Sequence, residues 1–158
     1  MEDRQFEIIY ELTARPLWAY VTRISGNASA ADDILQETYL RFLNASRKPY
    51  DADVARRYLF KIATNLVYDR FRSMSRRSEV EINETHAEVD SHLAADLEMT
   101  EVFAKLKSQE RTLLWLAYVE GYDHQQIAQI ANVNKLSVKV LLFRARRKLA
   151  ALIEGKKV

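Results

Sequence analysis

The sequence predicts an all-α protein: two small helical domains joined by an acidic flexible linker, with a helix-turn-helix in the second domain. Its 158 residues include only 3 glycines and 2 prolines, too few for the many turns of a β-sandwich or barrel. Apolar residues recur at helical spacings on either side of residues 79–101, a stretch with eight acids and no Lys or Arg. Such a composition is typical of a linker. We therefore expect domains at residues 1–77 and 97–158 and a linker at 78–96.

The first helix is expected from about Arg4 to Ile24, where apolar residues follow helical spacing. Pro16 should kink or divide this helix, because proline lacks an amide donor and clashes with the preceding turn. A stop signal follows at residues 25–27, Ser-Gly-Asn. Ser29 is then expected to cap a helix that begins near Ala30.

The second helix, ADDILQETYLRF at residues 31–42, has two different sides when its residues are placed at 100° intervals. The side expected to face the core carries Ala31, Ile34, Leu35, Thr38, Tyr39 and Phe42. The opposite side carries Asp32, Asp33, Gln36 and Glu37, with Leu40 in their midst. Leu40 is either one of the scattered apolar residues common on surfaces or the anchor of a binding patch with a polar rim.

A long third helix, VARRYLFKIATNLVYDRFRSM at residues 54–74, should follow a polar loop, with Asp53 as its cap. Its expected core face carries Ala55, Tyr58, Leu59, Ile62, Ala63 and Leu66. The rest of its surface mixes aromatic and basic residues, since residues 56–77 hold seven Lys or Arg and a single acid. This mixture is typical of surfaces that bind single-stranded nucleic acid. The alternative is that Phe60, Val67 and Phe71 pack against the first helix.

In the second domain the helical pattern returns at Leu97, and Ser108 is expected to cap a helix that ends at Gly121. Asp123 should cap the next helix, and Asn132 suits a left-handed turn between two short helices. The apolar residues that would lock these helices together are Ile127, Ala128, Ala131, Val133, Val138 and Leu142. The second of them displays Lys139, Arg144, Arg146 and Arg147. This pattern predicts a DNA-binding helix-turn-helix.

Other function classes find little support in the sequence. There is no cysteine, His86, His92 and His124 have no metal-ligand spacing, and no glycine-rich phosphate loop is present. We therefore expect no metal, no cofactor and no enzyme activity. The N-terminal MEDRQFEIIYEL has acids where a signal peptide has basic residues, and no apolar run approaches the roughly 18 residues of a membrane span. A soluble cytoplasmic protein without membrane insertion is expected.

Three stretches together resemble the extracytoplasmic-function (group IV) sigma factors of bacterial RNA polymerase. ADDILQETYLRF resembles their polymerase-binding segment, and RRYLFKIATNLVYDRFRSMSRR resembles their promoter-melting and minus-ten helix. LAYVEGYDHQQIAQIANVNKLSVKVLLFRARRKL resembles their minus-thirty-five module. The resemblance implies a transcription initiation factor that binds core RNA polymerase, directs it to specific promoters through both domains and assists strand opening.

The resemblance also implies which residues form each surface. Core polymerase would be bound by Asp32, Asp33, Gln36, Glu37, Leu40 and Arg41. The minus-ten strand would be held by Arg56, Arg57, Tyr58, Lys61, Asn65, Arg70, Arg72, Arg76 and Arg77, with the loop around residues 48–52. The minus-thirty-five element would be held by Lys135, Ser137, Lys139, Arg144 and Arg146.

The chain departs from the family pattern at several of these positions. Tyr58 stands where the family often has Trp, and Asn132 replaces the usual turn glycine. Leu136, Val140 and Leu141 replace residues that are commonly small, polar or arginine. Leu136, Val140 and Phe143 thus form an apolar stripe that fits either thymine methyl groups in the major groove or an inhibitory partner such as an anti-sigma factor.

A second hypothesis from another class is a helix-turn-helix regulator that acts as a dimer on duplex DNA without joining polymerase. This hypothesis explains the C-terminal half of the chain. It leaves the acidic helix with Leu40 and the arginine-rich helix unexplained.

Overall fold

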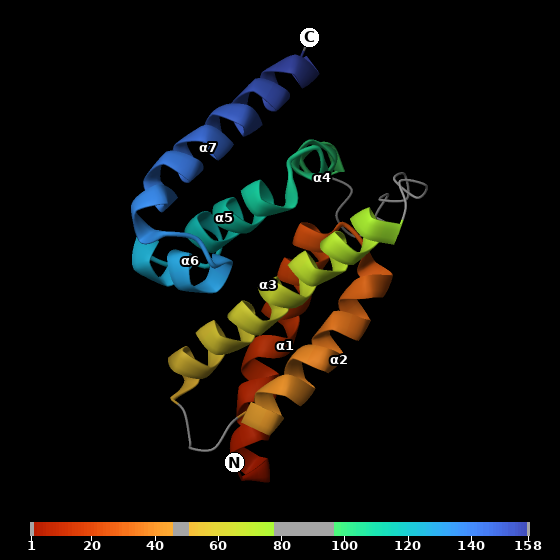
Figure 1. Cartoon of the computed structure of the whole chain (residues 1–158), viewed down its shortest axis with the longest axis vertical. Helices are drawn as coiled ribbons and strands as arrows, with labels where there is room; N and C mark the ends of the chain where they lie inside the picture. The colour runs from red at the N-terminus through yellow and green to blue at the C-terminus, as the bar shows by residue number, and fades with distance from the viewer. Residues whose placement is uncertain (1, 46–50, 78–96, 158) are drawn as a thin grey trace. The chain divides into compact units, whose positions relative to one another are not determined.

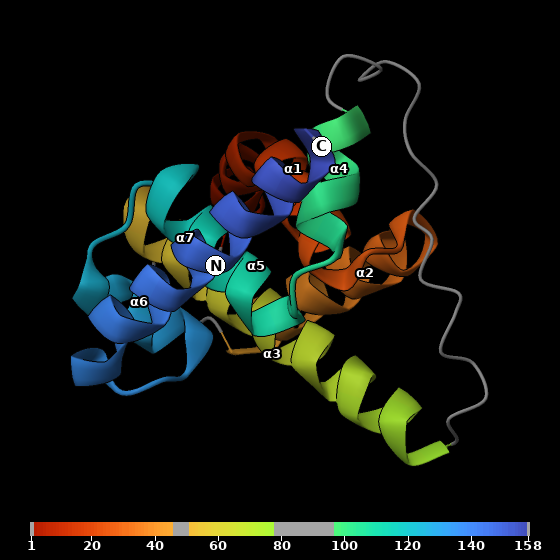
Figure 2. The same ribbon diagram turned by 90° about the horizontal axis from the view of Figure 1, so that it is seen from above.

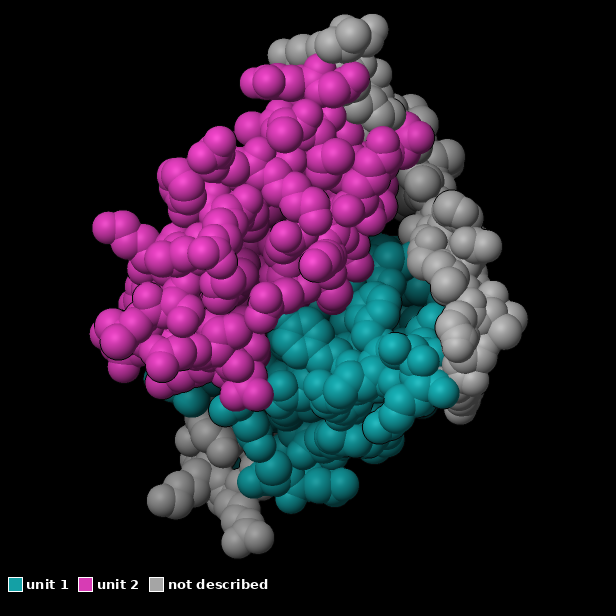
Figure 3. All heavy atoms as spheres, turned by 45° about the horizontal axis from the view of Figure 1, so that its top comes forward, with its two compact units in different colours: residues 1–86 teal, residues 87–158 magenta. Residues whose placement is uncertain are grey.

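The computed structural model describes residues 2–45, 51–77 and 97–157, and every regular element in these residues is a helix. Two compact units, residues 1–86 and 87–158, are coloured separately in Figure 3. The prediction of an all-α chain with two helical domains is therefore confirmed. The expected linker at 78–96 lies outside the described residues.

Unit 1 is a bundle of three helices, each of which packs against the other two (Figure 1). They are α1 (Asp3–Ser25), α2 (Ala28–Ala45) and α3 (Ala52–Arg77). The largest fully buried side chains include Leu17, Tyr20, Ile24, Phe42, Leu59, Phe60 and Val67. Three buried threonines in this core, at positions 13, 38 and 64, are satisfied locally, because each donates to the carbonyl four residues earlier, at 2.7 Å.

Tyr20 of α1 makes the central contact of unit 1 with α3. Its ring lies 4.8 Å from that of Phe60, centroid to centroid, and its hydroxyl lies 2.6 Å from Thr64 Oγ1. Phe60 and Val67 are fully buried, and Phe71 is half-buried. The packing alternative is therefore correct for Phe60 and Val67, because α3 is buried on two sides rather than one.

Helix α1 passes through Pro16 without interruption, so the expectation that Pro16 divides it is wrong. A proline inside a helix costs about 3 kcal/mol through the lost hydrogen bond and the clash. The following turns bury Leu17, Tyr20, Val21 and Ile24 completely. Each such side chain contributes about 1.5–3 kcal/mol when buried, so tertiary packing outweighs the cost of the proline.

Two helices are capped by other residues than the expected ones, and in both cases the cap lies nearer the preceding loop. Asn27, not Ser29, caps α2, since Asn27 Oδ1 accepts the Ala30 amide at 3.0 Å. Asp51, not Asp53, caps α3, since its Oδ1 accepts the Val54 amide at 2.9 Å. In each case the helix begins earlier than the sequence pattern predicts, so the expected cap lies within its first turn.

Unit 2 contains four helices, and α7 contacts the other three. They are α4 (Leu97–Ala104), α5 (Ser108–Tyr118), α6 (His124–Ala131) and α7 (Lys135–Lys157). Its core includes Leu113, Leu116, Ile127, Ile130, Val138 and Ala145. Buried Arg111 donates to the carbonyls of Ala104 and Leu106 and so closes the turn between α4 and α5.

The start of α5 differs from the expectation. Ser108 is its first residue, and Glu110 Oε1 accepts the amide of Lys107, the residue at the cap position, at 2.8 Å. The same oxygen lies 3.1 Å from Lys148 Nζ, which ties α5 to α7. Partial burial raises the pKa of Glu110, but these two contacts outweigh it and leave the pKa below the ordinary value. The helix ends at Tyr118, three residues before the expected Gly121.

The helix-turn-helix follows the predicted design. Asp123 Oδ1 accepts the Gln126 amide at 2.8 Å, and Gln126 Oε1 accepts the Asp123 amide at 3.0 Å, which completes a capping box. Asn132 adopts the left-handed conformation with φ 58° and ψ 48° and ends α6. Both predictions, the cap at Asp123 and the turn at Asn132, are confirmed.

The left-handed turn makes a first testable prediction. Asn132→Gly should leave the free energy of unfolding of the protein close to that of the parent, because glycine adopts positive φ without a steric cost. Asn132→Val should destabilise it by about 1–2 kcal/mol, because a β-branched residue is strained there. Chemical denaturation followed by circular dichroism measures both. Equal stability of the two variants would contradict the role of the turn.

Candidate functional site

The outer face of α2 is polar with a leucine at its centre, as the sequence predicts. Leu40 is 52% exposed, and the residues around it are exposed as well. These are Asp32, Asp33, Gln36, Glu37 and Arg41, which together with Leu40 make up the predicted polymerase-binding set. On the opposite side Ala31, Ile34, Thr38, Tyr39 and Phe42 are buried, and Leu35 is half-buried. The core therefore holds α2 in the one rotation that presents Leu40 to solvent.

Two members of this face are oriented by neighbours. Asp32 Oδ1 accepts a hydrogen bond from the indole Nε1 of Trp18 on α1, at 3.1 Å. Glu37 Oε2 pairs with Arg41 Nε at 2.9 Å, one turn along α2. An exposed pair of this kind adds little stability, but it holds both charges in place.

A hollow of about 510 Å³ adjoins Leu40 between α1 and α2. It is lined by Tyr10, Asp32, Leu35, Gln36, Tyr39, Leu40 and Leu43. Leu43 and Tyr10 are both well exposed, and sequence reasoning missed them. Leu43 is one turn after Leu40, so spacing alone could have found it. Tyr10 comes from another helix and carries no such signal.

Tyr39 forms the floor of this hollow. Its ring lies 4.9 Å from that of Tyr10 and 5.9 Å from that of Phe6, and its hydroxyl lies 2.6 Å from Thr13 Oγ1. Burial raises the pKa of Tyr39 to about 12, against the opposing effect of the Thr13 hydrogen bond. The hollow therefore has an aromatic, uncharged floor, and Asp32 is the one acid in its lining.

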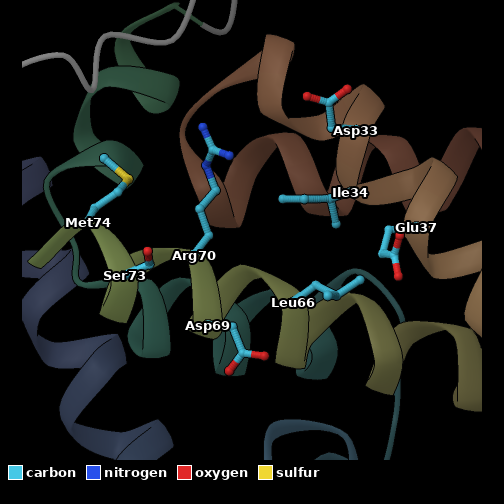
Figure 4. Close-up of a pocket in the computed structure, with 8 residues that line it drawn as sticks. All are labelled: Asp33, Ile34, Glu37, Leu66, Asp69, Arg70, Ser73 and Met74. Carbon is cyan, nitrogen blue, oxygen red and sulfur yellow. The ribbon is translucent and has the colours of Figure 1, made fainter. Parts of the chain in front are cut away.

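A second hollow of about 410 Å³ lies between α2 and α3 (Figure 4). It is lined by Asp33, Ile34 and Glu37 of α2 and by Leu66, Asp69, Arg70, Ser73 and Met74 of α3. Asp33 and Glu37 belong to the predicted polymerase-binding set and Arg70 to the predicted minus-ten set. The two predicted surfaces therefore meet along this hollow.

The predicted minus-ten residues fall into two groups along α3. Near its start Arg56, Arg57, Tyr58 and Asn65 are half-buried and Lys61 is exposed. Arg56 lies over the Phe60 ring at 5.4 Å, and Tyr58 lies 5.8 Å from the Phe42 ring. Packing therefore limits how far the side chains of Arg56 and Tyr58 can move. The predicted loop at 48–52 lies largely outside the described residues.

The second group lies on the last turns of α3, which extend beyond the other two helices of unit 1 (Figure 2). Arg70, Arg72 and Arg76 are exposed there, and Arg72 pairs with Asp69. Arg77 ends the helix. Arg70, Arg72 and Arg76 thus form an accessible cluster of positive charge.

In unit 2 the predicted minus-thirty-five residues lie on or at the start of α7. Lys135, Lys139, Arg144 and Arg146 are exposed, and Ser137 is half-buried. Arg146 donates to the Tyr118 hydroxyl at 2.8 Å. Leu136, Val140 and Phe143 are exposed on the same helix, so the predicted apolar stripe is present.

Within the described residues, no group of three or more His, Asp or Glu side chains has an arrangement that would hold a metal ion. None of the described helices is long and apolar enough to cross a membrane.

Comparison with known proteins gives matches to both units. The family models described as "Sigma-70 region 2" and "Sigma-70, region 4" match residues 9–77 and 96–149. The ECF RNA polymerase sigma factor SigL of Mycobacterium tuberculosis is 30% identical, over 92% of this chain and 87% of its own length. The chain belongs to the extracytoplasmic-function sigma factors.

Other relatives of this sigma factor are similarly distant. SigM of Bacillus subtilis is 25% identical, over 91% of this chain and 92% of its own length. A solved structure, that of the sigma factor RpoE in complex with the anti-sigma factor NepR from Bartonella quintana, has a TM-score of 0.73 and 18% identity. The match covers 94% of this chain and 96% of the chain in that structure, and it supports the fold.

Family membership decides between the two function hypotheses. A helix-turn-helix regulator that acts without polymerase would account for residues 96–149 only. The region 2 match over residues 9–77 includes both the acidic helix and the arginine-rich helix. The sigma factor hypothesis is therefore favoured, and members of this family are initiation factors rather than enzymes.

Proposed function

We propose that this sigma factor binds core RNA polymerase through the outer face of α2, with Leu40 as the central anchor. One observation carries the proposal: Leu40 is exposed within a polar face, while the opposite side of α2 packs in the core. A well-packed apolar residue inside a polar rim is the usual arrangement of an interface anchor. The rim consists of Asp32, Asp33, Gln36, Glu37 and Arg41.

The chemistry of this face suggests the complementary surface on polymerase. Three of the rim residues, Asp32, Asp33 and Glu37, are acids, so a basic surface is complementary to this face. The resemblance to the family implies that this surface is a helical element of the largest polymerase subunits. The hollow between Leu40, Leu43 and Tyr10 can accept an apolar side chain from such an element. Leu43 and Tyr10 are therefore additional members of the proposed interface.

The two basic surfaces bind promoter DNA in this proposal. The minus-ten strand is held by Arg56, Arg57, Tyr58, Lys61, Asn65, Arg70, Arg72, Arg76 and Arg77. Between residues 56 and 77 only Asp69 is acidic, and the half-exposed ring of Tyr58 offers a stacking surface for a base. Stabilising an unpaired strand in this way assists opening of the duplex.

The minus-thirty-five duplex is held by α7, the second helix of the helix-turn-helix. In this motif, the first turns of the second helix enter the major groove. The residues assigned to this contact are Lys135, Ser137, Lys139, Arg144 and Arg146. An anti-sigma factor is a further proposed partner, since the RpoE structure contains one. The protein acts as an initiation factor in the cytoplasm and uses no cofactor.

The anchor role of Leu40 predicts a large effect of one substitution. Leu40→Asp should weaken binding to core polymerase by about 2 kcal/mol or more, because it places a charge at the centre of the interface. The helical fold should survive, because the core stripe of α2 is on the other side. Leu12→Asp is the matched control, since Leu12 is 54% exposed on α1 and Leu40 is 52% exposed. Wild-type affinity of the Leu40→Asp protein would show that Leu40 is an ordinary surface residue.

The acidic rim predicts a different kind of effect. Glu37→Lys should lower the association rate with core polymerase and change its dependence on salt, because a rim charge acts mainly through long-range attraction. Glu11→Lys makes the same charge change at an exposed position of α1 and should have little effect. Stopped-flow association at two salt concentrations measures this. A change confined to the dissociation rate would contradict a rim role.

The basic side of α3 predicts a defect in strand opening. Replacing Arg56, Arg57 and Lys61 by Ala should spare polymerase binding and reduce open-complex formation. Each lost phosphate contact should lower the salt slope of DNA binding by about one unit. Replacing the exposed Arg4, Arg15 and Lys105 by Ala removes three charges elsewhere and controls for net charge, and permanganate footprinting reports strand opening. Normal opening by the triple variant would exclude this part of α3 from the mechanism.

A further inference from the structure

The apolar stripe of α7, formed by Leu136, Val140 and Phe143, has no role in the fold. Leu136 is 86% exposed, and Val140 and Phe143 are about half exposed, at 48% and 50%. The core contacts of α7 are made from other positions, where Val138 and Ala145 are fully buried. A large apolar side chain with this exposure at the start of a helix suggests contact with a ligand.

The first two turns of α7 offer few groups for hydrogen bonding to base edges. Residues 135–141 read KLSVKVL and contain no Asn, Gln, Asp, Glu or Arg. Together with Lys and Ser, those residue types make most specific hydrogen bonds to bases in the major groove, so only Lys135, Ser137 and Lys139 are left for such bonds here. Lys135 and Lys139 are exposed beside the stripe, and Ser137 is half-buried. Apart from these three residues, the first two turns can recognise bases directly only through apolar contact.

The charges around the stripe favour a polyanion as its ligand. No acid occurs between Lys135 and Ile153, and five exposed or half-buried cations follow Val138 along α7. They are Lys139, Arg144, Arg146, Arg147 and Lys148. At the far end of the stripe the guanidinium groups of Arg146 and Arg147 lie 6.0 and 5.8 Å from the centre of the Phe143 ring. Apolar side chains bordered by cations match a DNA groove, with methyl groups on its floor and phosphates along its edges.

We infer that Leu136 and Val140 contact the C5-methyl groups of thymines in the minus-thirty-five element, with Phe143 at the groove edge. Of the four bases, only thymine presents a methyl group in the major groove. Leu136 and Val140 are four residues apart, about 6 Å along a helix, which is just under two base-pair steps of about 3.4 Å. This assignment rests on the proposed contact between α7 and duplex DNA, and it adds the type of base that is recognised.

The experiment uses the 158-residue chain and duplex DNA with a randomised segment. Sequences bound by the wild-type chain are selected, and each thymine in the consensus is then replaced by deoxyuridine, which lacks only the C5-methyl group. We expect conserved thymines, and about fourfold weaker binding for each contacted methyl that is removed. Leu136→Ala or Val140→Ala should bind the thymine duplex more weakly and should abolish the penalty at one thymine each.

Lys139→Ala is the matched control on the same helix. It should weaken binding to thymine and deoxyuridine duplexes by the same factor, because a phosphate contact does not depend on the methyl group. Since Leu136 and Val140 lie outside the core, their alanine variants should retain wild-type thermal stability. A deoxyuridine penalty that persists in both alanine variants would arise from DNA shape and would overturn the inference.

The remaining outcomes separate this inference from the proposed function. Sequence-selective binding that is insensitive to deoxyuridine, or a consensus without thymine, would overturn the methyl contact alone. Absence of any sequence-selective duplex binding would overturn the proposed role of α7 and the inference with it. Wild-type DNA affinity of both alanine variants would also overturn the inference, and would leave the stripe as a surface for a protein partner.

Discussion

The packing of Tyr20 against α3 is the contact on which the arrangement of unit 1 depends. Its ring packs on Phe60 and its hydroxyl meets Thr64, so one side of α3 is closed by α1 while another is closed by α2. With two sides buried, the basic residues of α3 are confined to the remaining surface and to the last turns. The residues of this unit that are available to bind a partner are therefore those that the core leaves on the surface.

The same constraint separates charges of opposite sign. Acids gather on the outer face of α2, and cations gather along α3, where Asp69 is the single acid between residues 56 and 77. The two sets approach each other only at the hollow that contains Asp33, Glu37 and Arg70. A basic protein partner and a nucleic acid would therefore be attracted to neighbouring but different surfaces of one small bundle.

In unit 2, the helix cap and the turn of the helix-turn-helix determine which residues of α7 remain on the surface. The capping box at Asp123 and the left-handed Asn132 define both ends of α6, and buried Ile127 and Val138 hold it against α7. These contacts use one side of α7 and leave the start of the helix available, with Leu136 almost fully exposed. A residue so placed adds nothing to folding, so its role has to be sought in what α7 binds.

The sequence by itself determined the helical class, the two-sided character of α2, and the turn at Asn132. Each is a local property: helical spacing places Leu40 opposite Thr38, and few residues other than glycine and asparagine tolerate positive φ. Only the tertiary structure decided how many sides of α3 are buried, and hence that Phe60 and Val67 belong to the core. It also decided that α1 continues through Pro16, that Asn27 and Asp51 are the caps, and that Tyr10 joins Leu40 and Leu43 around one hollow. These outcomes depend on contacts between helices distant in sequence, whose burial energies outweigh local preferences of a few kcal/mol and leave no periodic signal in the chain.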